Sequence, residues 1–234
     1  MPHDTTAAYG IVTSVLSGIF MNDLHGFHPH SFSAASSEPD TLFYSRRPTG
    51  PMLDAGAQRA VTALYRTLLP EDGHILDLMA GPDSHLPPDM AFDSVIGIGV
   101  NAQALDANAR LTDRVVEDIN ETPDLPLADE SMDAACLCDV VPYLRQPVRV
   151  FREIARVLQP GGLIIITFGA RFIPQKATAL WQALDEGDRR RMLAVLLQRA
   201  GFGPVDNGNV TPAPEDMFWH DAVYAMTARR PENL

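Results

Sequence analysis

Short, almost wholly apolar runs alternate with segments of helical periodicity from residue 54 onward. The apolar runs are expected to form strands at 75–79, 95–99, 114–117, 134–138 and 163–168. Strands this apolar, separated by helices, are typical of a mostly parallel sheet that is covered on both faces. The pattern therefore predicts an α/β fold with a doubly wound, mostly parallel sheet.

Amphipathic segments predict the helices that cover this sheet. Val61, Tyr65 and Leu68 recur at helical spacing, which predicts a helix over 54–69 that Pro70 ends. Apolar stripes predict the remaining helices at 102–111, 147–158, 175–186 and 188–200. Asn101 is the expected N-cap of the first of these, since Asn side chains accept from free N–H groups. Two weaker strands are expected at about 202–210 and 222–229.

The first 50 residues differ from the rest of the chain. They are rich in Ser, Pro, His and Phe and show few periodic segments. We therefore predict an irregular N-terminal arm at 1–50, a candidate lid with a short helix near 6–20, and a single domain over 51–234. The stretch 6–20 lacks the basic residues of a signal peptide and is short for a membrane span, which favours a cytoplasmic protein without a membrane partner.

Charge and cysteine content narrow the partners. Lys and Arg number 18 and Asp and Glu number 30, which gives a net charge of −12. Nucleic-acid binding depends on basic side chains that neutralise phosphates, so this balance disfavours a nucleic-acid partner. The two cysteines, Cys136 and Cys138, would share one face of a strand, which favours reduced thiols over a disulfide.

The ends of the predicted strands carry the polar residues that point to chemistry. In open parallel sheets, ligands bind outside the carboxyl ends of the strands. Four segments lie at such ends, namely Asp77–Gly81, Gly97–Asn101, Glu117–Ile119 and Cys138–Asp139. A ligand site is therefore expected where these segments meet.

These segments, together with Leu125–Asp133 and Phe151–Gly162, resemble the class I S-adenosylmethionine-dependent methyltransferases of the type 11 group. The resemblance covers roughly residues 54–230 and is strongest over 124–168. It implies a Rossmann-like methyltransferase sheet, S-adenosylmethionine as the cofactor and methyl transfer as the reaction. Ser84–Pro87 and Phe43–Ser45 also resemble a narrower subgroup whose members mostly have no assigned substrate.

The resemblance also implies a set of cofactor-binding residues. They are Asp77, Met79, Ala80, Gly81, Gly99, Asn101, Asp118, Ile119, Cys138, Tyr44 and Arg46. In this interpretation Asp118 and Ile119 frame the adenine. Tyr44 and Arg46 either fold over the carboxylate of the cofactor as a lid or anchor the arm at the surface.

Two parts of the family pattern are altered. The three glycines of the first loop correspond to Met79, Gly81 and Asp83, so that one glycine is retained. Gly99 stands where the family has an acid that binds the ribose diol. We expect the amide of Asn101 to take over that contact.

Asp139, Tyr143 and His85 are the candidate catalytic residues. Asp139 follows the fourth strand, where the family places substrate contacts, but it could instead cap a helix at 140–144. His85 follows the first loop and could instead be a surface histidine. The other histidines of interest, His25, His28 and His30, lack a Cys, Asp or Glu that would complete a ligand set, and no metal site is expected.

Three functional hypotheses follow from these observations. The first is methyl transfer from S-adenosylmethionine to a small-molecule acceptor. The second is a catalytically silent methyltransferase-like protein that binds a ligand or regulates a partner. A nicotinamide-dependent oxidoreductase is disfavoured, because no Gly-x-Gly-x-x-Gly follows the first strand.

Overall fold

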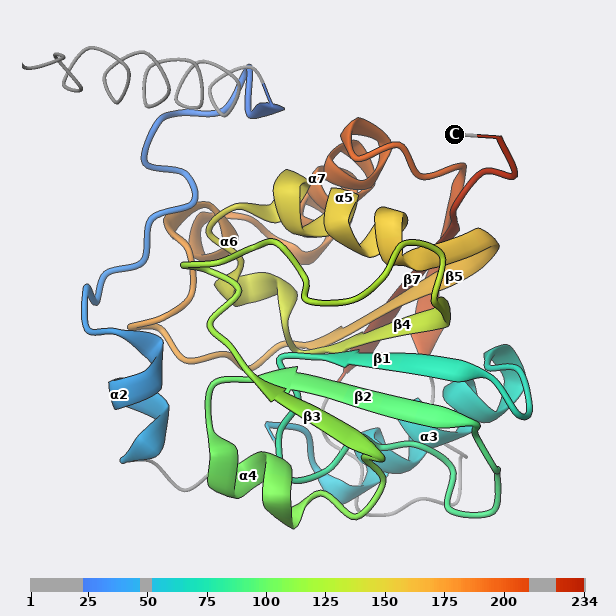
Figure 1. The fold of residues 1–234 in the computed structure, drawn as a ribbon. Coiled ribbons are helices and arrows are strands. Elements are labelled where there is room, and N and C mark those ends of the chain that lie inside the picture. Colours follow the sequence, from blue (N-terminus) through green and yellow to red (C-terminus); the bar gives the residue numbers. More distant parts are fainter. Residues whose placement is uncertain (1–22, 47–51, 211–221, 234) are drawn as a thin grey trace, which may run out of the picture.

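Residues 23–46, 52–210 and 222–233 are described by a computed structural model, in which seven strands form one sheet in the order β3-β2-β1-β4-β5-β7-β6 (Figure 1). The strands are β1 (His74–Leu78), β2 (Ser94–Gly99), β3 (Asp113–Val116), β4 (Met132–Cys138), β5 (Leu158–Gly169), β6 (Val205–Val210) and β7 (Val223–Arg229). Strands β1 to β5 pair in parallel, whereas β7 runs antiparallel to both β5 and β6. The predicted doubly wound, mostly parallel sheet is confirmed.

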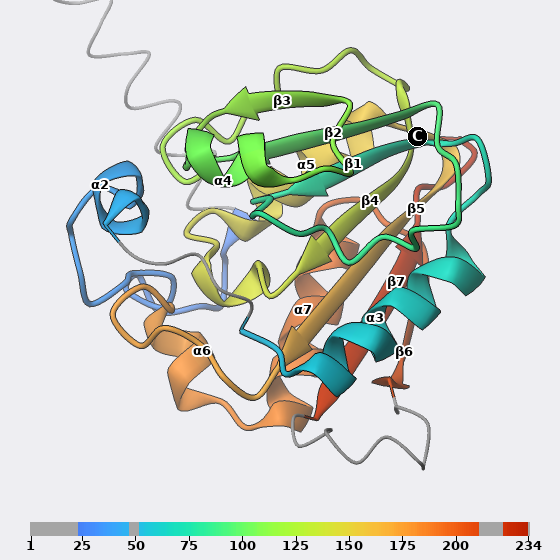
Figure 2. The same ribbon diagram turned by 90° about the horizontal axis from the view of Figure 1, so that it is seen from below.

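Helices cover both faces of the sheet (Figures 1 and 2). On one face lie α3 (Ala55–Leu68) and α4 (Ala102–Ala107), and on the other lie α5 (Pro147–Val157), α6 (Ala179–Ala183) and α7 (Glu186–Arg199). A short 3-10 helix, η1 (Val141–Tyr143), follows β4. The apolar stripes face the sheet: Val61 and Tyr65 of α3 and Phe151 and Ile154 of α5 are fully buried.

Three elements differ in length from their predictions. The helix expected at 102–111 ends at Ala107, because the side chain of Asn108 turns back to bond the loop after β1. The helix expected at 175–186 is reduced to α6. Strand β5 begins at Leu158, which pairs with Met132 before the register shifts and pairing resumes at Leu163.

The N-terminal arm lies against the body of the protein over its described part, residues 23–46. It contains a six-residue helix, α2 (Asp40–Ser45), which the sequence pattern did not predict. This helix lies beyond the carboxyl ends of β1, β2 and β3 (Figure 1). Backbone hydrogen bonds from Ala179 to Ser33 and from Leu180 to Ser31 join the arm to α6. The short helix predicted near 6–20 falls outside the described residues.

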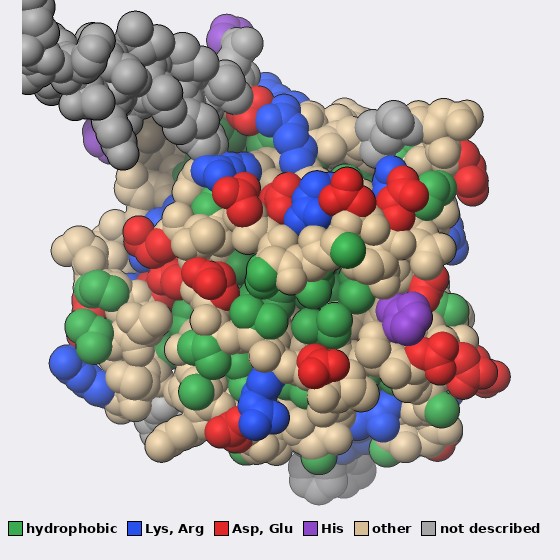
Figure 3. All heavy atoms as spheres, in the orientation of Figure 1, with side chains coloured by type: hydrophobic (Ala, Val, Ile, Leu, Met, Phe, Trp, Pro, Cys, Tyr) green, Lys and Arg blue, Asp and Glu red, His purple; other side chains and the backbone are tan. Residues whose placement is uncertain are grey.

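Basic and acidic side chains alternate over α5 in the face shown in Figure 3. Arg149 pairs with Asp124 at 2.7 Å and Arg156 with Asp129 at 2.6 Å, and Arg152 pairs with Asp23. Such pairing differs from the uninterrupted basic stripe of a nucleic-acid-binding surface. Within the described ranges, no helix is both long enough and apolar enough to cross a membrane.

Candidate functional site

A cavity of about 340 Å³ opens at the carboxyl ends of β1, β2 and β4. Its volume lies in the range of small-molecule sites. Many of the residues selected from the sequence line it, namely Asp77, Met79, Ala80, Gly81, His85, Asn101, Cys138, Asp139, Tyr143 and Tyr44. Loops that are distant in sequence therefore meet at one place, as the parallel topology requires.

Asp77 is the buried acid of this cavity. It is only 6% exposed, and the Ser84 hydroxyl donates to its Oδ2 at 2.5 Å. Asn108 in turn donates from Nδ2 to Ser84 Oγ at 2.8 Å and to the Gly81 carbonyl at 2.9 Å. Burial raises the pKa of Asp77 to about 7, against the lowering effect of the Ser84 hydrogen bond. The carboxylate is therefore held in place while its negative charge is poorly compensated, which favours a cationic ligand group beside it.

The loop after β1 lies very close to β2. The Ala80 amide donates to the Ile98 carbonyl at 2.8 Å, and a Cβ built on Gly99 would lie 2.5 Å from the Ala80 carbonyl oxygen. A side chain at position 99 therefore does not fit this loop conformation. Met79 has φ of 53°, the left-handed conformation for which glycine is better suited, and this is the position of the family's first glycine.

His85 also has a positive φ, of 54°, and its ring is 10% exposed. Asp83 holds the residue twice: Oδ1 accepts from the His85 amide at 2.8 Å, and Oδ2 lies 3.4 Å from Nδ1. Thr62 donates to the His85 carbonyl at 2.9 Å. Burial lowers the pKa of His85 and outweighs the opposite effect of Asp83, so the imidazole is neutral at neutral pH.

Asp139 and Tyr143 lie on the opposite wall, after β4. Asp139 Oδ1 accepts from the Gly169 amide at 2.9 Å and so joins the ends of β4 and β5. The N-cap of η1 is Val140, without a side-chain hydrogen bond, so the capping alternative for Asp139 is wrong. The Tyr143 hydroxyl accepts from the Ile173 amide at 3.0 Å, and burial raises the pKa of Tyr143 to about 12. Tyr143 is thus a neutral hydroxyl that can donate a hydrogen bond.

The side chain of Asn101 makes two structural hydrogen bonds at the end of β2. Its Oδ1 accepts from Ala104 and caps α4, as predicted, while Nδ2 donates to the Tyr44 carbonyl at 3.1 Å. The side-chain amide of Asn101, which was expected to bind the ribose, thus bonds to the backbone of the N-terminal arm. Arg46 turns away from the cavity and pairs with Glu38 at 3.2 Å.

Four of the residues expected to bind the cofactor do not line the cavity. Among the described residues, the cavity lining does not include Gly99, Arg46, Asp118 or Ile119. Ile119 is 2% exposed and packs in the core. Asp118 accepts from the Asn120 amide at 3.0 Å, an interaction within its own turn, and burial raises its pKa. Asp118 thus stabilises its own turn and Ile119 packs in the core, and their assignment to the adenine stays a prediction.

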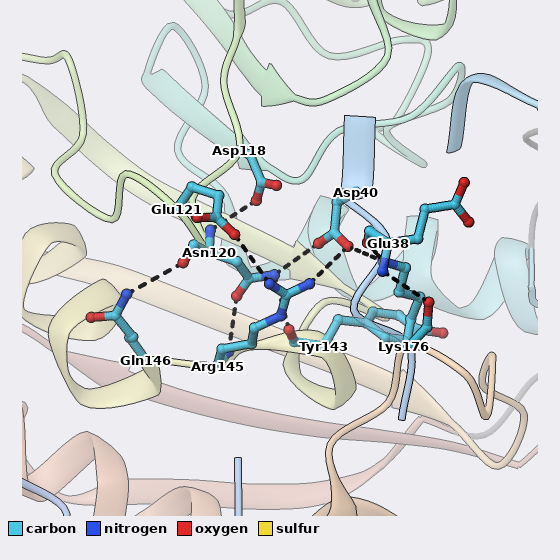
Figure 4. A network of polar contacts seen from close by, with 10 residues as sticks. Glu38, Asp40, Asp118, Asn120, Glu121, Tyr143, Arg145, Gln146 and Lys176 are labelled. Carbon is cyan, nitrogen blue, oxygen red and sulfur yellow. Dashed lines mark hydrogen bonds and ion pairs between the residues drawn. The ribbon is translucent and has the colours of Figure 1, made fainter. Parts of the chain in front are cut away.

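A buried polar cluster lies next to the cavity (Figure 4). We call it the Asp40 cluster, and it comprises Asp40, Asn120, Arg145 and Lys176. Asp40 Oδ1 lies 2.6 Å from Lys176 Nζ and 3.0 Å from an Arg145 nitrogen, while Oδ2 accepts from Asn120 at 3.1 Å. Lys176 also donates to the Glu38 carbonyl, and its Nζ lies 4.8 Å from the centre of the Phe43 ring.

Sequence reasoning missed these supporting residues. Ser84 belongs to the segment Ser84–Pro87, which resembles a narrower subgroup of the family, so the sequence held a signal for it. Asp40 and Lys176 are 136 positions apart and carry no local pattern that joins them. Their pairing emerges only when the arm is placed against the loop after β5.

Comparison with known proteins finds matches to methyltransferases. Residues 76–166 match the family described as a methyltransferase domain. A dTDP-4-amino-2,3,4,6-tetradeoxy-D-glucose N,N-dimethyltransferase from Saccharopolyspora spinosa is 32% identical over 110 residues, which cover 45% of this chain and 44% of the relative. Methyltransferase GfsG from Streptomyces halstedii is 32% identical over 169 residues, 68% of this chain and 55% of the relative. The chain thus spans about half the length of these curated relatives.

A solved structure resembles almost the whole chain. The crystal structure of the cyclase SpnF superposes with a TM-score of 0.56 at 20% identity, covering 99% of this chain and 98% of that one. At this identity the likeness is one of fold.

Proposed function

We propose that this chain, a protein of the class I methyltransferase-domain family, transfers a methyl group from S-adenosylmethionine to a small molecule. The observation that carries the proposal is Asp77, a buried carboxylate at the carboxyl end of β1 that lines the cavity and has a pKa of about 7. A cationic ligand would compensate a charge that the protein itself leaves poorly compensated.

The residues present suit the two halves of such a cofactor unequally. The cationic half would lie beside Asp77 and the retained Gly81. A Cβ added at Gly81 would meet no atom within 4 Å, so a ligand can come close to the backbone there. The ribose half would meet Asn101 and Val100 without the usual carboxylate. We therefore expect binding that is dominated by the charged end.

When bound, the cofactor supplies a methyl group on a positively charged sulfur. His85 is the best proton acceptor among the candidates, because its imidazole is neutral and Asp83 holds its Nδ1 side, leaving Nε2 for the acceptor. Tyr143 would donate a hydrogen bond to the acceptor, and Asp139 would orient it. The apolar wall, with Met52, Val140 and Ile173, would exclude water from the reacting atoms.

A small-molecule acceptor agrees with the size of the cavity and with the paired charges over α5. It also agrees with the name of the Saccharopolyspora spinosa relative, a dimethyltransferase of a nucleotide-linked amino sugar. A methyltransferase-like protein without methyl transfer is the second candidate. It is favoured by the absent carboxylate at Gly99, and a protein named as a cyclase has the same fold.

Calorimetric titration with S-adenosylhomocysteine tests the proposal. We expect a dissociation constant in the micromolar range, corresponding to about −8 kcal/mol. The absence of binding heat at about 1 mM ligand, with the protein shown to be folded by circular dichroism, would reject methyl transfer in favour of the second candidate.

The pH dependence of the affinity for S-adenosylmethionine, whose sulfur is positively charged, tests the role of Asp77. The native carboxyl titrates near 7, above its usual 3.8, so protonation weakens binding of a cationic group as the pH falls below about 7. Affinity should fall by up to about tenfold per pH unit there. Asp77→Asn should bind roughly ten- to a hundredfold more weakly at pH 8 and lose this pH dependence. Equal affinities of both proteins at pH 6 and pH 8 would contradict the assignment.

A further inference from the structure

We propose that the Asp40 cluster positions the arm segment Glu38–Arg46 as a cover of the ligand cavity, and that covering and ligand binding stabilise each other. The second part rests on the proposed function, whereas the first does not. Asp40 and Lys176 are positioning residues in this proposal, because neither lines the cavity.

The cluster joins four segments that are distant in sequence. Asp40 comes from α2, Asn120 from the turn after β3, Arg145 from the loop after η1 and Lys176 from the loop after β5 (Figure 4). The side chains of Asp40 and Lys176 are 3% and 1% exposed. Charges buried to this extent are retained only with well-placed partners, so the cluster fixes one position of the arm.

The same cluster also bonds to a segment of the cavity wall. Asn120 Nδ2 donates to the Tyr143 carbonyl at 3.1 Å, and the Arg145 amide donates to Asn120 Oδ1 at 2.9 Å. Tyr143 itself lines the cavity. The interactions that hold the arm thus also hold the segment after β4 that carries a candidate acceptor contact.

At the other end of α2, the arm is tied to the cavity directly. Tyr44 lines the cavity, and its carbonyl accepts from Asn101, which lines the cavity as well. The arm therefore spans from the turn after β3 to the end of β2. Of these two strand ends, that of β2 lines the cavity, through Val100 and Asn101.

Coupling between two events on one protein is reciprocal. If docking of the arm raises ligand affinity by a given factor, ligand binding protects the docked arm by the same factor, commonly about 5- to 150-fold. If the cluster stabilised the arm without any coupling to the ligand, docking of the arm would not change ligand affinity, and ligand binding would not protect the docked arm.

Cys138 offers a readout that needs no ligand. It is a free thiol that lines the cavity, while Cys136, two residues away on β4, is 1% exposed and does not. Alkylation by iodoacetamide, resolved by fragment-ion mass spectrometry, reports opening of the cavity at Cys138 and global unfolding at Cys136.

We expect Lys176→Met to raise the alkylation rate of Cys138 at least about fivefold and to leave Cys136 protected. Amides of residues 40–46 should exchange faster to a similar extent. Arg149→Met, which removes a partly exposed ion pair with Asp124 outside the Asp40 cluster, is the matched control and should change neither rate.

Asn101→Asp covers the case in which Lys176→Met does not fold. Aspartate keeps the oxygen that caps α4 but replaces the donor to the Tyr44 carbonyl by a second, charged oxygen, so the tie to the arm is removed while the cap is kept. It should also speed Cys138 alkylation. If a folded variant shows faster amide exchange at 40–46 but an unchanged rate of Cys138 alkylation, the arm segment does not cover the cavity and the proposal is wrong.

S-adenosylhomocysteine then tests the coupling. It should slow Cys138 alkylation and exchange at 40–46 in the unsubstituted protein, and bind Lys176→Met more weakly by the same factor. Equal affinity for both proteins would overturn the coupling alone. No binding to either would overturn the proposed function and the coupling, and the cover would still be decided by the ligand-free rates.

Discussion

Gly99→Asp is expected to destabilise the protein and to abolish ligand binding, although it restores the acid of the family pattern. The new Cβ would lie 2.5 Å from the Ala80 carbonyl oxygen, and that atom belongs to backbone that the amide of Ala80 ties to Ile98. Overpacking costs about 1–3 kcal/mol even where side chains can adjust, and here the obstacle is backbone. We expect a loss of about 3 kcal/mol, or roughly 6–12 °C in the melting temperature of a chain this long.

Thermal unfolding followed by circular dichroism measures this loss. Gly81→Ala is the matched control, because a Cβ at Gly81 meets no atom within 4 Å and the residue has no positive φ. Its melting temperature should stay within a few degrees of the unsubstituted protein. A Gly99→Asp protein as stable as Gly81→Ala would show that the loop after β1 moves freely, and would restore position 99 as a place for a ribose acid.

Lys176→Met is expected to lower the free energy of unfolding by about 3 kcal/mol. Removing one partner of a buried ion pair leaves the other charge poorly compensated, which commonly costs about 3–5 kcal/mol, and here Arg145 still neutralises part of the Asp40 charge. The double variant Asp40→Asn, Lys176→Met removes both charges and should recover more than half of the loss.

Urea denaturation at pH 7 gives the free energies for a double-mutant cycle. Arg149→Met, which breaks a partly exposed pair with Asp124, should cost less than about 1 kcal/mol. If the double variant is less stable than Lys176→Met by the full cost of a second independent loss, the two side chains do not act as a pair and the description of the cluster is wrong.

The sheet could be predicted from the sequence because its strands are continuous apolar runs that parallel pairing on two covered faces requires. Residues 163–168 and 134–138 show this most clearly. The polar residues at the carboxyl ends of β1 and β4 followed from topology, which brings Asp77 and Asp139 to one edge. Family resemblance added the expected cofactor, and its assignment of Asp118 and Ile119 to the adenine stays a prediction, since neither residue lines the cavity.

What the sequence could not show depends on contacts between distant segments. Asn108 lies in a run whose periodicity favours helix, yet its side chain is needed by Ser84 and Gly81, and the helix ends there. The sequence alone indicates that Gly99 replaces a carboxylate. The structure shows that Gly99 lies so close to the Ala80 carbonyl that only glycine fits there. Asp40 belongs to an arm without pattern, and its charged partners lie 105 and 136 residues further along the chain.

The order of the strands has a consequence for how the chain is made. β5 carries the most apolar run of the sheet, and its second edge is paired by β7, the last strand along the chain. A ribosome releases the N-terminal segments first, so Leu163–Phe168 emerges well before its partner does. Until Val223–Arg229 is available, that uncharged edge is open to pairing with other chains, which makes the interval between these two segments the time of greatest aggregation hazard during synthesis.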